Sequence, residues 1–70
     1  MLNDLAIFAS RFNIEPKDAY VLPALFERTA QIAGMPQRQF IAEATFRNQA
    51  LGAYLADAAR KVANTDREAA

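Results

Sequence analysis

The sequence predicts an all-α fold, a small bundle of three to four helices whose last segment is either long or split near Asn48. Three observations support this prediction. Residues that favour helices are common, whereas the β-branched residues Val, Ile and Thr together number nine among 70. Apolar residues recur at steps of three and four, as on one face of a helix, rather than alternating as in a half-buried strand. Proline and glycine divide the chain into segments of helical length.

The first helix is predicted from about Asn3 to Phe12. Its apolar positions lie three or four residues apart and therefore share one face. Either Asn3 or Asp4 is suited to cap the N-terminus, where a carboxylate also favours the positive end of the helix dipole. The helix is expected to end before Pro16, because the residue preceding a proline is biased away from helical angles. The predicted apolar face consists of Leu2, Leu5, Phe8, Ala9 and Phe12.

The middle segment contains two prolines, and Pro16 suits the first turn of a helix. Pro23 leaves two arrangements open. Either a short helical turn ends near Val21 and a new helix begins at Pro23, which we favour slightly, or one helix is kinked there. Gly34 is at the position expected for the C-terminal cap. The apolar stripe of this segment consists of Leu25, Phe26, Thr29, Ile32 and Ala33.

The last helical segment is predicted from Pro36, in the favoured first position, to about Ala63. It contains the clearest apolar register of the chain, with alternating steps of three and four as in a heptad repeat. A break at Asn48 is an open alternative, because Asn caps helices well and Gly52 weakens a helix interior. The seven positions of this register, which we call the seam, are Ile41, Ala44, Asn48, Leu51, Leu55, Ala58 and Val62.

Length and composition bound the function. A chain of 70 residues forms one domain at most, and we predict a single helical domain over 1–63 and a disordered or frayed C-terminal tail over 64–70. The sequence contains no Cys and no His, which excludes zinc fingers, iron–sulfur clusters, thiol nucleophiles and histidine-based catalytic triads. We therefore predict no catalytic residue, no metal, no cofactor and no small-molecule substrate, and we expect that the protein is not an enzyme.

Charge and hydropathy bound the partners. The formal charge is zero, so no long-range field indicates an acidic or nucleic-acid partner. No apolar run approaches the roughly 20 residues that a membrane-spanning helix needs. The first residues carry an early acid, Asp4, instead of the basic segment of a signal peptide. The expectation is a soluble cytoplasmic protein without a membrane partner.

The seam suggests the function that we favour, a non-enzymatic protein–protein interaction module that self-associates through the Ile41–Val62 helical face. Ala44 and Ala58 allow two helices to approach closely, and Asn48 can fix their register across a dimer axis. In the alternative interpretation the seam is the core face within one chain, because so small a domain needs its longest stripe inside. Both interpretations hold if one half of the helix packs within the chain and the other half packs against a second chain. The predicted partner-binding residues, toward itself or another protein, are Arg47, Leu51, Tyr54, Leu55 and Arg60.

The stretch from Phe26 to Phe40, FERTAQIAGMPQRQF, carries a second function prediction. A helix-turn-helix needs a small residue where two helices cross, a glycine at the turn and apolar anchors on both sides. The residues at those offsets are Ala30, Gly34, Met35 and Phe40. The stretch thus resembles the helix-turn-helix motif of bacterial DNA-binding proteins, from which it departs at Thr29 and Glu43, where an apolar residue is usual. The other interpretation is a plain helix stop followed by a helix start.

The resemblance implies a DNA-binding regulator that reads the major groove with the helix starting at Pro36. Gln can pair with adenine and Arg with guanine through two hydrogen bonds each. Residues 36–63 carry two more positive than negative charges, which gives mild electrostatic support. In this alternative the partner is DNA, and the DNA-binding residues are Gln37, Arg38, Gln39 and Arg47.

The remaining acidic and aromatic residues are predicted to have structural roles. Two acidic pairs, at a helix start and in the tail, are expected to be surface residues rather than a catalytic pair, since catalysis needs a desolvated pocket. These pairs are Glu15 with Asp18 and Asp66 with Glu68. Surface ion pairs four residues apart are predicted for Glu43–Arg47 and Asp57–Lys61. Most aromatic side chains are predicted in the core, and those expected to be partly exposed are Phe46 and Tyr54.

Overall fold

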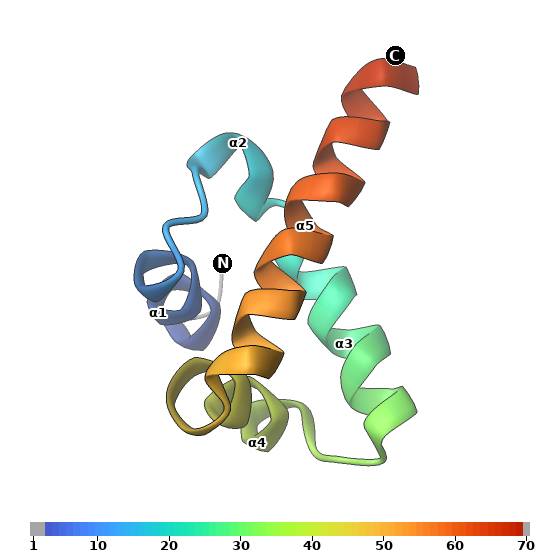
Figure 1. The fold of residues 1–70 in the computed structure, drawn as a ribbon. Helices are drawn as coiled ribbons and strands as arrows, with labels where there is room; N and C mark the ends of the chain where they lie inside the picture. Colours follow the sequence, from blue (N-terminus) through green and yellow to red (C-terminus); the bar gives the residue numbers. More distant parts are fainter. Residues whose placement is uncertain (1–2, 70) are drawn as a thin grey trace.

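The computed structural model describes residues 3–69, which are 85% helical and contain no strand. The predicted all-α fold is confirmed. Its elements are α1 (Asn3–Arg11), α2 (Pro16–Ala19), α3 (Leu22–Ala33), α4 (Gln37–Ala42), the π-helix η1 (Glu43–Arg47) and α5 (Gln49–Ala69). Figure 1 shows α5 running diagonally across the molecule, with α1 and α4 beside its first half, α2 beside its second half and α3 on the other side.

The two prolines of the middle segment each lie in the first turn of a helix. Pro16 is the first residue of α2, and Pro23 is the second residue of α3. A missing backbone N–H costs no intrahelical hydrogen bond at these positions. Tyr20 and Val21 separate the two helices. Pro23 therefore belongs to a new helix and does not kink a single one, as the sequence slightly favours.

α1 and α3 end in the same kind of cap. The chain enters the left-handed region at Asn13, with φ of 56°, and at Gly34, with φ of 71°. In each case the next residue donates its backbone N–H to the carbonyl five residues back, at 2.8 Å from Ile14 and 3.1 Å from Met35. This is the Schellman arrangement, and in both helices the residue after the cap packs on the core. The cap predicted at Gly34 is confirmed.

The last segment is split, and Asn48 marks the break. Asn48 has φ of −127° and ψ of 89°, outside the helical region. Its backbone N–H donates to the carbonyl of Glu43 at 2.8 Å and closes η1, while its Oδ1 accepts a hydrogen bond from the N–H of Leu51 at 3.0 Å. Asn48 therefore caps α5, and the alternative of one long helix through this position is wrong.

A row of phenylalanine rings in contact forms the centre of the core. Phe8 lies 4.8 Å from Phe12 and 4.9 Å from Phe26 between ring centroids, and Phe26 lies 5.9 Å from Phe40. The last two contacts are edge-to-face, which suits the ring quadrupoles. Because these rings come from α1 and the turn after it, α3 and α4, one row of side chains joins three helices.

α5 covers the core with small side chains. Its buried residues are Gly52, Leu55, Ala56, Ala59 and Ala63. A Cβ atom on Gly52 would lie 2.2 Å from the backbone oxygen of Ala44 and 2.3 Å from the ring of Phe12. Gly52 is thus a point where α5 approaches Ala44 and Phe12 closely. The sequence prediction treated Gly52 only as a residue that weakens a helix and did not include this packing role. The buried face also passes through Ala59 and Ala63 in place of Ala58 and Val62, so the seam is only partly the core face.

The helix α5 continues through 64–69, where the sequence predicts a disordered or frayed tail. Two polar contacts with the α2 region hold these turns. Arg67 donates a hydrogen bond to the carboxylate of Asp18 at 2.8 Å, and the hydroxyl of Tyr20 donates to Asp66 at 2.8 Å. The prediction considered apolar contacts alone and therefore missed this attachment. Leu2 and Ala70 lie outside the described residues.

Candidate protein-interaction surface

Two hollows lie beside α3 and α5, and we call them together the α3–α5 groove. One hollow of about 320 Å³ lies near the start of α5. It is lined by Thr29, Ile32 and Ala33 from α3, Phe40 from α4, and Leu51, Tyr54 and Leu55 from α5. A second hollow of about 400 Å³ lies near the end of α5 and is lined by Tyr20, Val21, Ala24, Leu25, Val62 and Asp66. In Figure 1 the end of α3 lies apart from the start of α5, whereas the beginning of α3 overlaps the middle of α5.

Large apolar side chains stand along both edges of the α3–α5 groove. Ile32 is 74% exposed, Tyr54 is 70% exposed and Val62 is 43% exposed. Ile32 and Ala33 belong to the stripe predicted to be buried on α3, and this part of the prediction is wrong. The buried face of α3 instead steps by four residues through Leu22, Phe26 and Ala30. An apolar surface shared by two elements is typical of an interaction site rather than of scattered surface residues.

The structure brings three of the five predicted partner-binding residues together at this groove. Tyr54 is exposed, Leu51 is half-buried, and Leu55 is 1% exposed. Leu55 is therefore part of the floor and the core, not an exposed anchor, because its position on α5 faces the packed interior. The predicted partial exposure of Tyr54 and Phe46 is confirmed.

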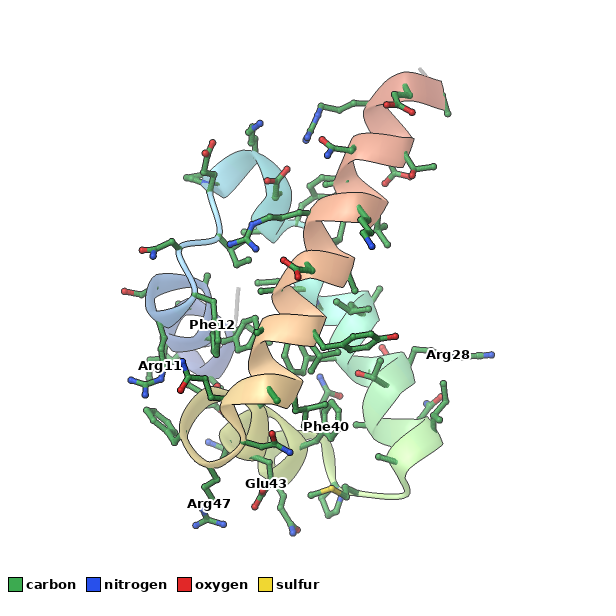
Figure 2. All side chains as sticks on the ribbon, in the orientation of Figure 1. Arg11, Phe12, Arg28, Phe40, Glu43 and Arg47 are labelled. Carbon is green, nitrogen blue, oxygen red and sulfur yellow. The ribbon has the colours of Figure 1, made fainter. Side chains whose placement is uncertain are left out.

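The two predicted arginines lie elsewhere. Arg60 donates to the backbone carbonyl of Phe12 at 2.7 Å and to Asp57 at 3.2 Å, so it ties α5 to the end of α1. Arg47 lies on η1 and pairs with Glu43 at 3.2 Å. Figure 2 labels both residues at the lower end of the molecule. The predicted Glu43–Arg47 pair is thereby confirmed. Asp57 pairs with Arg60 and not with Lys61 as predicted, because a residue three positions on is also a neighbour on the helix.

The start of α4 carries the residues of the DNA-binding alternative. Gln37 is half-buried, Gln39 is exposed, and the side chain of Arg38 is 89% exposed. Arg38 lies 3.4 Å from the carboxylate of Asp4. Pro36 precedes α4 with ψ of 139° and acts as its N-cap residue, so the helix begins one residue later than predicted.

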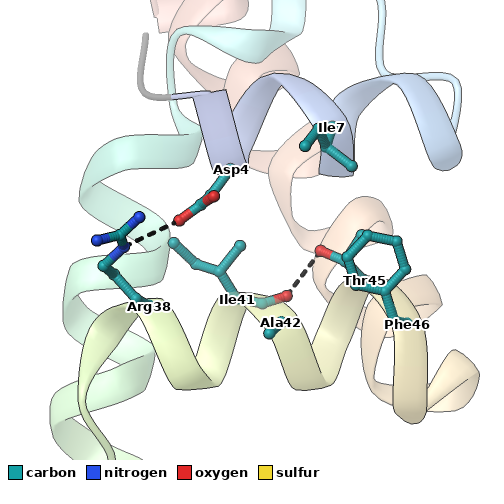
Figure 3. A pocket seen from close by; sticks show the side chains of 7 residues that line it. All are labelled: Asp4, Ile7, Arg38, Ile41, Ala42, Thr45 and Phe46. Atoms are coloured by element: carbon teal, nitrogen blue, oxygen red, sulfur yellow. Dashed lines mark hydrogen bonds and ion pairs between the residues drawn. The ribbon is translucent and has the colours of Figure 1, made fainter.

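A smaller pocket of about 170 Å³ lies between α1, α4 and η1 (Figure 3). The Asp4–Arg38 pair lies at one end and the ring of Phe46 at the other. The hydroxyl of Thr45 donates to the carbonyl of Ile41 at 2.6 Å, so this buried polar group is already satisfied. The guanidinium of Arg11 lies 5.8 Å from the centroid of Phe46, within cation–π range. The pocket thus has an apolar wall, and its charged groups are the Asp4–Arg38 pair at one end.

The acidic pair at the start of α2 differs from its prediction. Asp18 is buried and pairs with Arg67, whereas Glu15 is exposed and lies 4.0 Å from Lys17. The residue that sequence reasoning missed is Arg67, because ion pairs 49 positions apart leave no local spacing signal. Across residues 3–69 no group of three or more acidic, His or Cys side chains is placed to hold a metal ion. None of the helices described is both long and apolar enough to cross a membrane.

The fold and this surface define a class, a small all-α helical protein with an exposed apolar groove. Comparison of the chain with models of known protein families, with curated proteins and with solved structures finds no match.

Proposed function

We propose that the protein is a non-enzymatic interaction module that self-associates through the α3–α5 groove. The observation that carries the proposal is the exposure of Ile32, Tyr54 and Val62 along two adjacent helices. A domain of this size has a small core, so burying further apolar surface against a partner offsets conformational entropy that the core alone barely balances.

The groove supports a mechanism based on burial. Ile32 and Val62 contribute apolar area from opposite edges, and Tyr54 adds a rigid ring whose hydroxyl can stay in contact with water. The half-buried Leu51 and the floor residue Leu55 give the hollow an apolar base. Such a site presents a preformed rigid surface, which needs neither a cofactor nor a bond-making step.

Sedimentation or light scattering at high micromolar concentration tests self-association. We expect a mass above the chain mass of 7.7 kDa and a loss of association for Ile32→Ser. Ile7→Ser is the matched control, because Ile7 is also an exposed isoleucine but lies on α1, beside the smaller pocket. Circular dichroism establishes that both variants remain helical. A mass of 7.7 kDa for the unaltered chain under these conditions contradicts the proposal.

DNA binding is the alternative function, and the observation that favours it is the exposure of Arg38 and Gln39 at the start of α4. The turn at Gly34 precedes them, and the buried Ala30 and Phe40 flank that turn as the helix-turn-helix resemblance implies. Base-reading side chains in such motifs lie at this end of the second helix.

A titration of the protein with a random-sequence DNA duplex, followed by amide chemical shifts, tests this alternative at low salt and again at about 150 mM salt. Shifts clustered on residues 36–47 that weaken steeply with salt would support DNA binding, since phosphate contacts release counterions. Amide chemical shifts that do not change at either salt concentration would contradict DNA binding.

A further inference from the structure

The exposed strip of α5 is arranged symmetrically about Ala58. Tyr54 lies four residues before Ala58 and Val62 four residues after it, and both are exposed while Ala58 is half-buried. At about 1.5 Å per residue, each large side chain lies about 6 Å from Ala58 along the helix axis. Two copies of α5 running in opposite directions can therefore place Tyr54 of one against Val62 of the other, with the small Ala58 side chains meeting between them.

Charged residues flank the same strip on one side. Helical spacing of about 100° per residue places Asp57 and Lys61 on the flank away from α3, and Val62 on the flank toward it. Both charged residues are exposed. Asp57 accepts a hydrogen bond from Arg60 at 3.2 Å, and within residues 3–69 the ammonium of Lys61 forms no ion pair. The flank thus offers one carboxylate and one ammonium to a second helix.

The order of these charges favours opposite helix directions. Around a two-fold axis at Ala58, Asp57 of one copy and Lys61 of the other differ by about 3 Å in axial position, within the reach of a lysine side chain. The symmetry forms this pair twice. A parallel two-fold arrangement would instead place the charged flanks of the two copies on opposite sides of the interface, so that no Asp57–Lys61 pair could form between them.

We infer that the occupant of the exposed α5 strip is a second copy of this chain, packed antiparallel with Ala58 on the two-fold axis and with reciprocal Asp57–Lys61 ion pairs. This inference rests on the proposed self-association and adds its geometry. In this dimer Asp57 and Lys61 determine the relative direction of the two helices, and Tyr54 and Val62 form the apolar contact.

Cysteine cross-linking tests the position of the axis, because the chain has no cysteine of its own. We expect Ala58→Cys to form a disulfide-linked dimer under mild oxidation at least about tenfold faster than Ala53→Cys, since paired thiols have a high effective concentration. Ala53 is the matched control, an exposed alanine on the same helix whose spacing places it on another face. Equal cross-linking rates for the two variants would overturn the antiparallel geometry.

Exchange of the charges tests the helix direction. Asp57→Lys and Lys61→Asp should each raise the dimer Kd by about tenfold through two like-charge contacts, and the double variant should restore it. Glu68→Lys, which changes the net charge equally in the last turn of α5, should have little effect. If the unaltered chain dimerises but the double variant does not regain its dimer Kd, the antiparallel geometry is overturned and the proposed self-association is not. A monomeric unaltered chain overturns both.

Discussion

At Gly52 the packing of α5 depends on the absence of one side-chain carbon. Gly52→Ala should destabilise the fold by about 1–3 kcal/mol, although alanine favours a helix by about 1 kcal/mol over glycine. The physical reason is that the new Cβ would clash with the backbone oxygen of Ala44, which cannot rotate away. Urea unfolding followed by circular dichroism measures the change.

Gly34→Ala is a useful comparison for that experiment. A Cβ on Gly34 would meet nothing within 4 Å, so its cost comes from the positive φ alone, about 1 kcal/mol. An unfolding midpoint for Gly52→Ala equal to that of the unaltered protein would contradict the close approach of α5 to Ala44.

The hydroxyl of Tyr20 reports on the attachment of the last turns of α5. Its hydrogen bond to Asp66 raises the pKa of Tyr20, with smaller contributions from partial desolvation and from the negative charge of Asp66. In a Tyr54→Phe background, absorbance titration should show Tyr20 ionising at higher pH than in the same chain with Asp66→Ala. Identical titration midpoints would show that the hydrogen bond is absent in solution.

The raised pKa also gives a direction for stability. Because folding favours the protonated phenol, the stabilising effect is present below the ordinary tyrosine pKa and is lost as the pH rises through the raised value. The last turns of α5 should therefore loosen in alkaline solution, and Asp66→Ala should remove this part of the pH dependence.

Among the elements, α2 is the shortest, and a single ion pair joins it to the far end of α5. Arg67→Ala would leave the carboxylate of Asp18 without its partner in a buried position, so we expect a loss of about 1–3 kcal/mol. A double-mutant cycle with Asp18→Ala should give a clear coupling free energy. Thermal or urea unfolding provides the free energies of unfolding of the unaltered chain, the two single variants and the double variant.

The exposed Asp57–Arg60 pair provides the contrast for this cycle. It lies near the surface and within one helix, so its coupling should be below about 1 kcal/mol. Equal coupling in the two cycles would mean that burial of Asp18 contributes nothing.

Whole helices could be predicted where the signal is local. α1, the proline positions of α2 and α3, and the caps at Gly34 and Asn48 all follow from residues that act within one turn. The orientation of α5 does not, because its buried face consists, apart from Leu55, of alanines and Gly52, which carry little hydropathy signal. The seam residues Leu51 and Val62 are more apolar, and they lie at the α3–α5 groove.

At the scale of the molecule, the phenylalanine row links α1, α3 and α4 within the buried core. Phe40→Ala should destabilise the fold by about 3–5 kcal/mol, because it removes a buried ring from the end of this row. A domain this small has a total stability of similar size, so the variant is expected to be largely unfolded. Circular dichroism at room temperature measures this directly.

Phe46→Ala is the matched control for that variant. Phe46 is exposed, and its ring lies within cation–π range of Arg11, so the change should cost less than about 1 kcal/mol. A folded Phe40→Ala chain with an unchanged melting curve would show that the row is not central to stability.

The α3–α5 groove could be predicted only in part, because it depends on how the whole molecule is packed. Tyr54 and Leu51 lie on one helical stripe of the sequence, but Ile32 joins them only because the fold places α3 beside α5. That placement depends on the contacts of every helix with the core, and no local pattern encodes it. The same holds for Arg60, whose partner is a backbone carbonyl 48 positions away.

α5 follows in the chain all the helices that it covers, and this order has a consequence for synthesis. The contacts made by Gly52, Arg60 and Arg67 reach back to the turn after α1, to η1 and to α2. A chain emerging from the ribosome therefore holds its phenylalanine row without a cover until α5 has left the exit tunnel. The row should therefore become packed in one late step, after α5 has been made, and not helix by helix.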